Sequence, residues 1–202
     1  MLYRLLDRRL APAPQFARVG WLIERLYAHR GYHGAGRLEN SPSAFRAALD
    51  HGLGIECDVQ QSAEGQAMVF HDWDLDRLTG AAGPVREQPA AALAHLRLGA
   101  SEDTIWPLAR LLEAVGGEVP LLIEIKSRKD VAYAPLCLAV RQALLRYSGP
   151  VAVMSFDPRV VHWFAANASH LVRGLVVTEE DERGFAGEWR RHAALWRARP
   201  DF

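Results

Sequence analysis

The sequence has few cysteines, no excess of one charge and no long apolar run, and each shortage excludes a class of protein. Cys57 and Cys137 are the only cysteines, and their separation is unlike metal-ligand spacing. We therefore expect reduced core thiols in an intracellular, cytoplasmic protein. The 24 basic and 24 acidic residues balance to a net charge of zero, which gives no general attraction to nucleic acid. No stretch approaches the roughly 18 to 20 apolar residues of a spanning helix, so we expect no transmembrane segment.

The first 25 residues carry arginines but lack the apolar core of a signal peptide. Their leucines and arginines can separate onto two sides of a short amphipathic helix: Leu2, Leu5, Leu6 and Leu10 against Arg4, Arg8 and Arg9. We expect residues 1–25 to pack as a helical segment on a single domain formed by residues 26–202. Loose contact of this helix with a membrane surface is the alternative.

What the chain does contain is a repeated alternation of short apolar runs and helical patterns. Half of the 202 residues are hydrophobic, enough for one domain with a sizeable core. The predicted strands are 26–28, 55–59, 67–70, 121–125, 151–154 and 174–177, and the predicted helices include 107–115, 131–147, 158–167 and 184–197. This alternation predicts parallel β/α units, either a barrel or an open doubly wound sheet. The long connection over 72–106 is either functional or a simple insertion.

Ionisable residues occur at or near the ends of the first four predicted strands. In chain order they are His29 and Arg30, Glu56 and Asp58, His71 and Asp72, and Glu124 and Lys126. In parallel β/α architectures the carboxyl ends of the strands form the face that carries active sites. We therefore expect these side chains to meet at one edge of the sheet.

The three acids on core strands are the best candidates for metal ligands. Side chains alternate along a strand, so Glu56 and Asp58 share one face and Cys57 points to the other. Glu124 likewise lies between two isoleucines. A buried carboxylate is costly unless it is paired or binds a metal, and ligation by oxygen alone suits Mg²⁺ or Ca²⁺ better than zinc. The alternative is a salt-bridge network, with Arg30 and Lys126 neutralising the acids and no metal.

Two of the eight histidines are candidates for proton transfer. His29 and His71 follow apolar runs beside the candidate metal-binding acids, and imidazoles titrate near neutral pH, so a pair can act as general acid and base. Arg30 and Lys126 add fixed positive charge for an anion such as phosphate. The set suggests phosphoryl transfer from a phosphodiester. The other histidines are predicted to be surface or packing residues, although His33 could reach the site.

The order and spacing of these pieces resemble the glycerophosphodiester phosphodiesterase family. The matching pieces are His29-Arg30-Gly31, Glu39-Asn40, Glu56-x-Asp58, His71-Asp72, Leu75-Asp76-Arg77-x-Thr79-Gly80 and Glu124-Ile125-Lys126. The resemblance implies a (β/α)₈ barrel that hydrolyses a glycerophosphodiester, or a lysophospholipid, to an alcohol and glycerol 3-phosphate.

The resemblance also implies a role for each matching residue. His29 and His71 correspond to the acid–base pair, and Arg30 and Lys126 to the phosphate-binding cations. Glu56, Asp58 and Glu124 correspond to ligands of Mg²⁺ or Ca²⁺, and Glu39 and Asn40 to a supporting pair behind the site. Trp73 and residues 74–77 either line the substrate entrance or cap the loop.

The chain departs from the family pattern in its strand count. Only six strands can be counted before Phe202, so we expect an eight-stranded barrel truncated after about six strands. The N-terminal segment, another subunit or solvent would then cover the gap, and open sheet edges would favour homo-oligomers.

The strand count leaves a second function open, namely an inactive binding module that keeps the site but not the turnover. An amidohydrolase would need a His-x-His pair after the first strand, and His29-Arg30-Gly31 is not such a pair.

Overall fold

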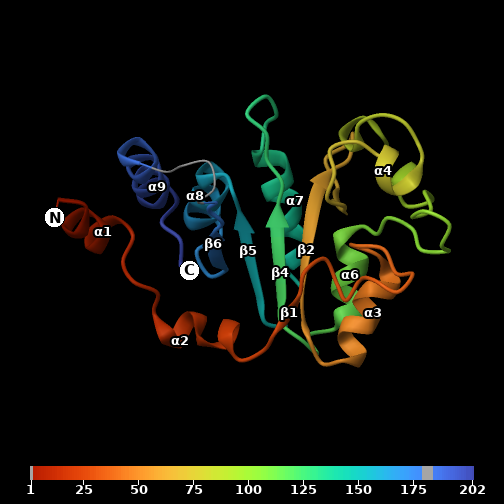
Figure 1. Cartoon of the computed structure of the whole chain (residues 1–202), viewed down its shortest axis with the longest axis horizontal. Coiled ribbons are helices and arrows are strands. Elements are labelled where there is room, and N and C mark those ends of the chain that lie inside the picture. The colour runs from red at the N-terminus through yellow and green to blue at the C-terminus, as the bar shows by residue number, and fades with distance from the viewer. Residues whose placement is uncertain (1, 179–183) are drawn as a thin grey trace.

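The computed structural model describes residues 2–178 and 184–202. Its centre is a mainly parallel sheet with neighbours in the order β1-β2-β4-β5-β6 (Figure 1). The strands are β1 (Tyr27–Ala28), β2 (Gly54–Gln61), β3 (Ala67–Val69), β4 (Leu121–Ile125), β5 (Val151–Ser155) and β6 (Val172–Leu175). The five strands of this path are parallel, and β3 pairs with β2 outside it. The carboxyl ends of β2, β4 and β5 therefore lie along one edge.

Helices cover one face of the parallel sheet. They are α3 (Pro42–Asp50), α6 (Leu108–Val115), α7 (Ala134–Leu144) and α8 (Pro158–Asn167). Side-chain alternation sends Ile123 and Ile125 of β4 into the core under these helices, while Leu122 faces the other side. This arrangement of parallel strands and covering helices confirms the predicted α/β fold. In the described residues it forms a partial barrel.

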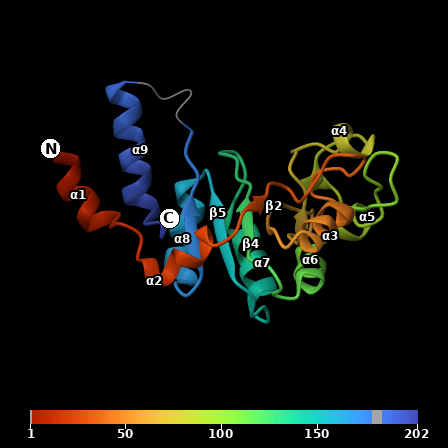
Figure 2. The ribbon, with the colours of Figure 1, turned by 60° about the horizontal axis from the view of Figure 1, so that its bottom comes forward.

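The N-terminal segment runs beneath the other face of the sheet. It contains α1 (Leu2–Leu10), α2 (Phe16–Val19) and the 3₁₀ helix η1 (Gly20–Ile23), and Val19 packs with Ala152 and Val172. The views agree that α1 lies beside α9 (Phe185–Ala198) (Figures 1 and 2). Asp7 Oδ1 accepts a hydrogen bond from Trp196 Nε1 at 2.8 Å. Within the described ranges, no helix is long and apolar enough to cross a membrane.

The third strand differs from the prediction, because β3 is antiparallel to β2 and is not a further parallel barrel strand. Strand β2 continues past the site to Gln61, and the chain then reverses through Gly65, which has a φ of +89°. Strand β3 returns alongside it, and Phe70 N donates to Asp58 O at 3.0 Å. Phe70 therefore lies beside Asp58, although β3 runs in the opposite direction to β2. His71 and Asp72, which follow Phe70, still lie near the carboxyl end of the parallel strands.

Local sequence signals explain most element boundaries. Ser41 Oγ accepts from Ala44 N at 3.2 Å and caps α3, and Asp157 accepts from Arg159 N at 2.8 Å and caps α8, which spans the predicted 158–167. Helix α7 is shorter than the predicted 131–147, with Pro135 in its first turn. Strand β6 lies two residues earlier than predicted, because Val172 pairs with Ala152 of β5.

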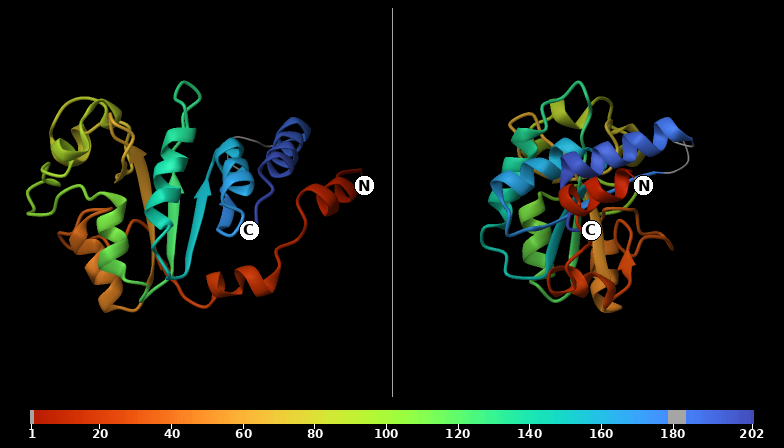
Figure 3. Two further views of the ribbon diagram at one scale, coloured as in Figure 1. Left: turned by 180° about the vertical axis from the view of Figure 1, so that it is seen from behind. Right: turned by 90° about the vertical axis from the view of Figure 1, so that its left-hand side faces the viewer.

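The connection after β3 is a packed unit with its own apolar core. It contains α4 (Asp76–Thr79), η2 (Val85–Glu87) and α5 (Ala90–Leu93). Phe70, Leu75, Leu93 and Ile105 are at most 1% exposed within it. In Figure 3 it stands at one end of the sheet, far from α1 and α9. Its core gives the loop that begins at His71 a rigid support.

Candidate active site

The three predicted acids converge on one buried spot. Asp58 of β2 lies directly opposite Glu124 of β4 in the parallel register, and Glu56 is two residues earlier on the same face. One carboxylate oxygen from each residue lies within 4.8 Å of the others. The three residues are 5% (Glu56), 1% (Asp58) and 7% (Glu124) exposed. Cys57 points the other way, into the core under the helices.

Two cations neutralise part of this charge. Lys126 Nζ lies 2.8 Å from Asp58 Oδ1 and 2.7 Å from Glu124 Oε1, and Arg30 Nε lies 3.3 Å from Asp58 Oδ2. Burial alone lowers the pKa of Lys126, but the attraction of Asp58 and the hydrogen bonds to both acids raise it overall. The side chain is therefore a fixed ammonium. The salt-bridge network weighed as an alternative is thus present among the described residues.

The network leaves the Glu56 side chain without a lysine or arginine partner. Three carboxylates face two cations, and buried Glu56 Oε1 has no hydrogen-bond partner among the described residues. Glu56 Oε2 accepts from Arg30 N at 2.9 Å. Burial, and then repulsion by Asp58, raises the pKa of Glu56 to about 8. An unpaired oxygen between two other carboxylates is a donor set that fits a hard divalent cation.

Unusual backbone conformations place Arg30 and Asn40. Both have positive φ, +56° and +53°, and Gly31 between them has +78°. A Cβ on Gly31 would lie 3.0 Å from the backbone of Ala44 in α3, so glycine is needed there. Asn40 is 1% exposed; its Nδ2 donates to Asp58 Oδ2 at 2.9 Å and its Oδ1 accepts from Asp58 N at 3.2 Å. Asn40 therefore fixes one face of Asp58, and its supporting role in the site stays a prediction.

The two histidines have different surroundings: His29 lies beside Glu56, and His71 lies in a cleft that Glu124 and Lys126 also line. The His29 side chain is 68% exposed, and its Nε2 lies 3.9 Å from Glu56 Oε2. Partial burial, and then the charge of Arg30, lowers the pKa of His29. The His71 side chain is 29% exposed, and its Nδ1 lies 2.7 Å from Asp72 Oδ1. One imidazole is therefore loosely placed and the other is tightly held.

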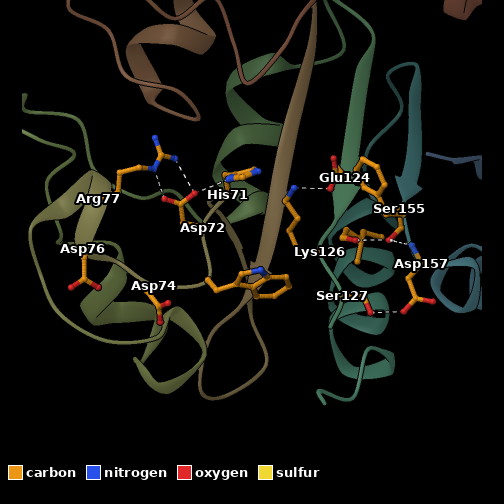
Figure 4. A pocket seen from close by; sticks show the side chains of 13 residues that line it. His71, Asp72, Asp74, Asp76, Arg77, Glu124, Lys126, Ser127, Ser155 and Asp157 are labelled. Carbon is orange, nitrogen blue, oxygen red and sulfur yellow. Dashed lines mark hydrogen bonds and ion pairs between the residues drawn. The ribbon is translucent and has the colours of Figure 1, made fainter. Parts of the chain in front are cut away.

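A cleft of about 610 Å³ opens between the loops that follow β3, β4 and β5, and Glu124 is the acid of the cluster that lines it. Figure 4 shows His71, Asp72, Asp74, Asp76 and Arg77 on one side and Glu124, Lys126, Ser127, Ser155 and Asp157 on the other. Trp73 also lines it, so Trp73, Asp74, Asp76 and Arg77 border the cleft, whereas Leu75 packs in the core of the connection.

Glu39 lies behind this wall of the cleft. Its carboxylate bonds Arg30 at 2.9 Å and Arg77 at 2.6 Å. Burial alone raises the pKa of Glu39, but the hydrogen bonds from Arg77 and the charge of Arg30 lower it overall.

The sequence reasoning missed several contacts that shape the site. Gln60 Nε2 donates to His71 O at 2.9 Å. Its place two residues beyond Asp58 was a usable signal, because alternation puts it on the same face. Ser127 Oγ donates to Asp157 Oδ2 at 2.6 Å and ties the loop after β4 to α8. The ion pairs of Arg77 with Asp72 and Glu39 depend on tertiary structure, and no spacing rule reveals them.

Comparison with known proteins identifies relatives across most of the chain. A model of the glycerophosphoryl diester phosphodiesterase family matches residues 29–199. A probable glycerophosphodiester phosphodiesterase 1 of Mycobacterium tuberculosis is 33% identical over 161 residues, which are 72% of this chain and 58% of the relative. A glycerophosphodiester phosphodiesterase of Caldanaerobacter subterraneus is 31% identical over 159 residues, covering 74% of this chain and 65% of the relative. The chain therefore spans less than two thirds of the length of these two relatives.

Solved structures share the architecture. The glycerophosphodiester phosphodiesterase of Thermotoga maritima superposes with a TM-score of 0.67 at 28% identity, over 87% of this chain and 70% of that one. An Oleispira antarctica phosphodiesterase, solved with the product sn-glycerol-3-phosphate, gives a TM-score of 0.73 at 23% identity, over 86% and 72%. The matched region contains the acids, both histidines and both cations described above. The chain belongs to the glycerophosphoryl diester phosphodiesterase family.

Proposed function

We propose that this protein is a divalent-cation-dependent phosphodiesterase that hydrolyses glycerophosphodiesters to an alcohol and glycerol 3-phosphate. The observation that carries the proposal is the buried cluster of Glu56, Asp58 and Glu124, with its unpaired Glu56 oxygen, next to an open cleft that Glu124 lines. Family membership supplies the substrate class. The alcohol group, which could be a small polar group or the lysolipid of a lysophospholipid, stays a prediction.

Glu56, Asp58 and Glu124 would hold Mg²⁺ or Ca²⁺, since all three offer oxygen ligands. A bound cation would offset the negative charge that builds up on the phosphate oxygens. Arg30 and Lys126 place two more positive charges beside the same acids, and Lys126 also lines the cleft. Together they give an anionic diester a favourable place above an otherwise acidic floor.

His29 and His71 would divide the proton transfers. One imidazole would take a proton from the nucleophile, either water or the 2-hydroxyl of the substrate's glycerol, and the other would protonate the leaving alcohol. His71 lines the cleft, and His29 lies at the end of β1 beside Glu56. The two imidazoles would act on the phosphodiester from different segments, one at the end of β1 and one after β3.

Release of glycerol 3-phosphate from glycerophosphocholine tests the proposal. We expect turnover with Mg²⁺ or Ca²⁺, none with chelator, and loss of activity in His29→Ala and in His71→Ala with folding and cation binding intact. Turnover that survives chelation would overturn the role of the metal, and activity in either variant would remove that histidine from the pair. Cation binding without any turnover would instead make this chain an inactive binding module.

Two expectations about the setting of the protein accompany the proposal. Cys57 and Cys137 are unpaired and buried, which agrees with a reducing cytoplasmic compartment. Strands β1 and β6 lie at the two ends of the described parallel path, where self-association would take place if the chain forms homo-oligomers.

A further inference from the structure

Arg77 makes more contacts than a surface arginine normally does. It lies in α4, in the connection after β3, and its side chain is 51% exposed. Its Nε and Nη2 donate to the two carboxylate oxygens of Asp72, and Nη2 and Nη1 donate to those of Glu39 at 2.6 and 3.2 Å. Isolated exposed ion pairs contribute little, whereas paired contacts of one guanidinium with carboxylates fix geometry. Arg77 is therefore a clamp between two acids.

The first of these acids orients His71. The hydrogen bonds from Arg77 lower the pKa of Asp72 to about 2. Asp72 is then ionised at neutral pH and can only accept hydrogen bonds. His71 Nδ1, 2.7 Å from Asp72 Oδ1, must consequently carry the hydrogen. This leaves Nε2 as the nitrogen available for proton transfer in the cleft.

The second acid reaches the other half of the site. Glu39 Oε1 accepts from Arg30 Nη1 at 2.9 Å, and Arg30 is the cation beside Asp58. A continuous chain of contacts thus runs from Arg30 through Glu39, Arg77 and Asp72 to His71. The two arginines and two carboxylates of this chain of contacts cancel in formal charge. The chain therefore holds Arg30 and His71 in place without adding net charge to the site.

We propose that Arg77 is a positioning residue of the proposed phosphodiesterase, holding Asp72 against His71 and Glu39 against Arg30. The inference rests on the proposed function. His71 needs such support because it follows the short strand β3 and does not lie on a strand itself. With Arg77 removed, Asp72 is free to rotate, and the imidazole loses its fixed tautomer and direction toward the phosphate.

Kinetics of Arg77→Ala, Arg77→Lys and a matched control test this role. We expect Arg77→Ala to lower kcat about 10- to 100-fold with little change in KM, as supporting residues of a site typically do. Arg77→Lys should recover only part of the loss, because an ammonium cannot make paired contacts. Arg97→Gln removes an exposed arginine of the same connection, paired with Glu102 at 2.8 Å, and should leave kcat unchanged.

Two further measurements separate positioning from direct substrate contact. Millimolar guanidinium should restore part of the Arg77→Ala activity, because the site is half exposed, whereas the same concentration of sodium chloride should not. In a His71→Ala background, Arg77→Ala should lower the residual activity by clearly less than it does in the wild type, because the Asp72–His71 arm is already lost and only the Glu39–Arg30 arm remains. The proposal would be overturned by an unchanged kcat in Arg77→Ala or by a rise in KM alone. A full additional loss of activity in the double variant would also overturn it.

A spectroscopic readout decides the point independently of activity. Imidazole ¹H–¹⁵N spectra, with the His71 signals assigned from His71→Ala, should show the Nδ1-protonated form in the wild type and a mixture of tautomers in Arg77→Ala. The same tautomer in both proteins would overturn the positioning role. Absence of diester turnover by the wild-type protein would overturn the proposed function and leave this comparison standing.

Discussion

The floor of the site and its rim are built in different ways. The floor carboxylates Glu56, Asp58 and Glu124 are at most 7% exposed and project from two neighbouring strands of a parallel sheet. At the rim, the His29 and His71 side chains are 68% and 29% exposed and lie where the chain leaves β1 and β3. Burial makes each floor charge part of the stability of the protein, whereas the rim imidazoles remain accessible to substrate and to protons. Substitutions in the floor should therefore change stability and function together, and those at the rim should change function alone.

Removal of Lys126 should give the largest loss of stability and so tests the contrast between floor and rim most severely. Lys126→Met leaves Asp58 and Glu124 buried without the ammonium that contacts both. We expect the metal-free protein to lose about 3–5 kcal/mol in its free energy of unfolding, the usual effect of removing one partner of a buried pair. Added Mg²⁺ should reduce this loss. Urea denaturation in chelator measures it, with Lys129→Met, at an exposed lysine three residues on, as a control within about 0.5 kcal/mol.

Two substitutions at Asn40 separate the contribution of its side-chain hydrogen bonds to Asp58 from that of its backbone conformation. Asn40→Ala removes both hydrogen bonds to Asp58 and puts an alanine at a φ of +53°, so it should cost about 2–4 kcal/mol. Asn40→Gly loses the same hydrogen bonds but tolerates the backbone, and should cost less. Thermal and urea unfolding compare the two. Equal losses would show that backbone conformation contributes nothing here.

The pH dependence of stability sharpens the contrast further. The pKa of Glu56 is raised to about 8 in the folded protein, above its value of about 4.3 in an unfolded chain. The native state therefore holds a proton that the unfolded state has lost, and stability is full below about pH 4 and falls as pH rises toward 8. We expect the metal-free protein to lose up to about 1.4 kcal/mol per pH unit across this window.

Glu56→Gln provides the control for this slope. Gln cannot titrate, so urea denaturation of the variant at several pH values in chelator should show a flatter dependence between pH 5 and pH 8 than the wild type does. Saturating Mg²⁺ should also flatten the wild-type slope, because a bound cation favours the ionised carboxylate. Identical slopes for the two proteins in chelator would show that Glu56 is not protonated in the folded state.

His29 should show the smallest effect on stability. Its side chain is exposed, and its nearest acid oxygen is 3.9 Å away, so His29→Asn should change the free energy of unfolding by less than about 0.5 kcal/mol. The same variant should lose diester turnover. A loss of several kcal/mol in the free energy of unfolding would mean that His29, like the floor acids, stabilises the fold, and would contradict the distinction between floor and rim.

The floor could be read from the sequence because strand periodicity determines it. Acids two residues apart in an apolar run must share a face, and acids of adjacent parallel strands meet when the strands are in register, as Asp58 and Glu124 do. The end of β1 was also readable, since an apolar run followed by His29-Arg30-Gly31 marks a strand that stops at a turn. The helix caps at Ser41 and Asp157 were readable for similar local reasons.

The rim could not be read in the same way, because its geometry depends on non-local contacts. An apolar run such as Ala67–Val69 has the same pattern in a parallel and in an antiparallel strand, so the direction of β3 was assigned wrongly. The clamp of Arg77 on Asp72 and Glu39 joins residues 38 positions apart, and only the folded connection over 72–106 brings them together. Sequence thus predicted which residues take part at the rim, but not how they are held.

Cation binding by chelator-treated protein, measured by titration calorimetry, tests the central claim most directly. We expect one Mg²⁺ or Ca²⁺ per chain, with release of a proton near pH 7 because Glu56 must ionise, and loss of binding in Asp58→Asn and in Glu56→Gln. A wild-type protein that binds no divalent cation, or variants that bind it as well as the wild type, would contradict the claim that these buried acids form a metal site.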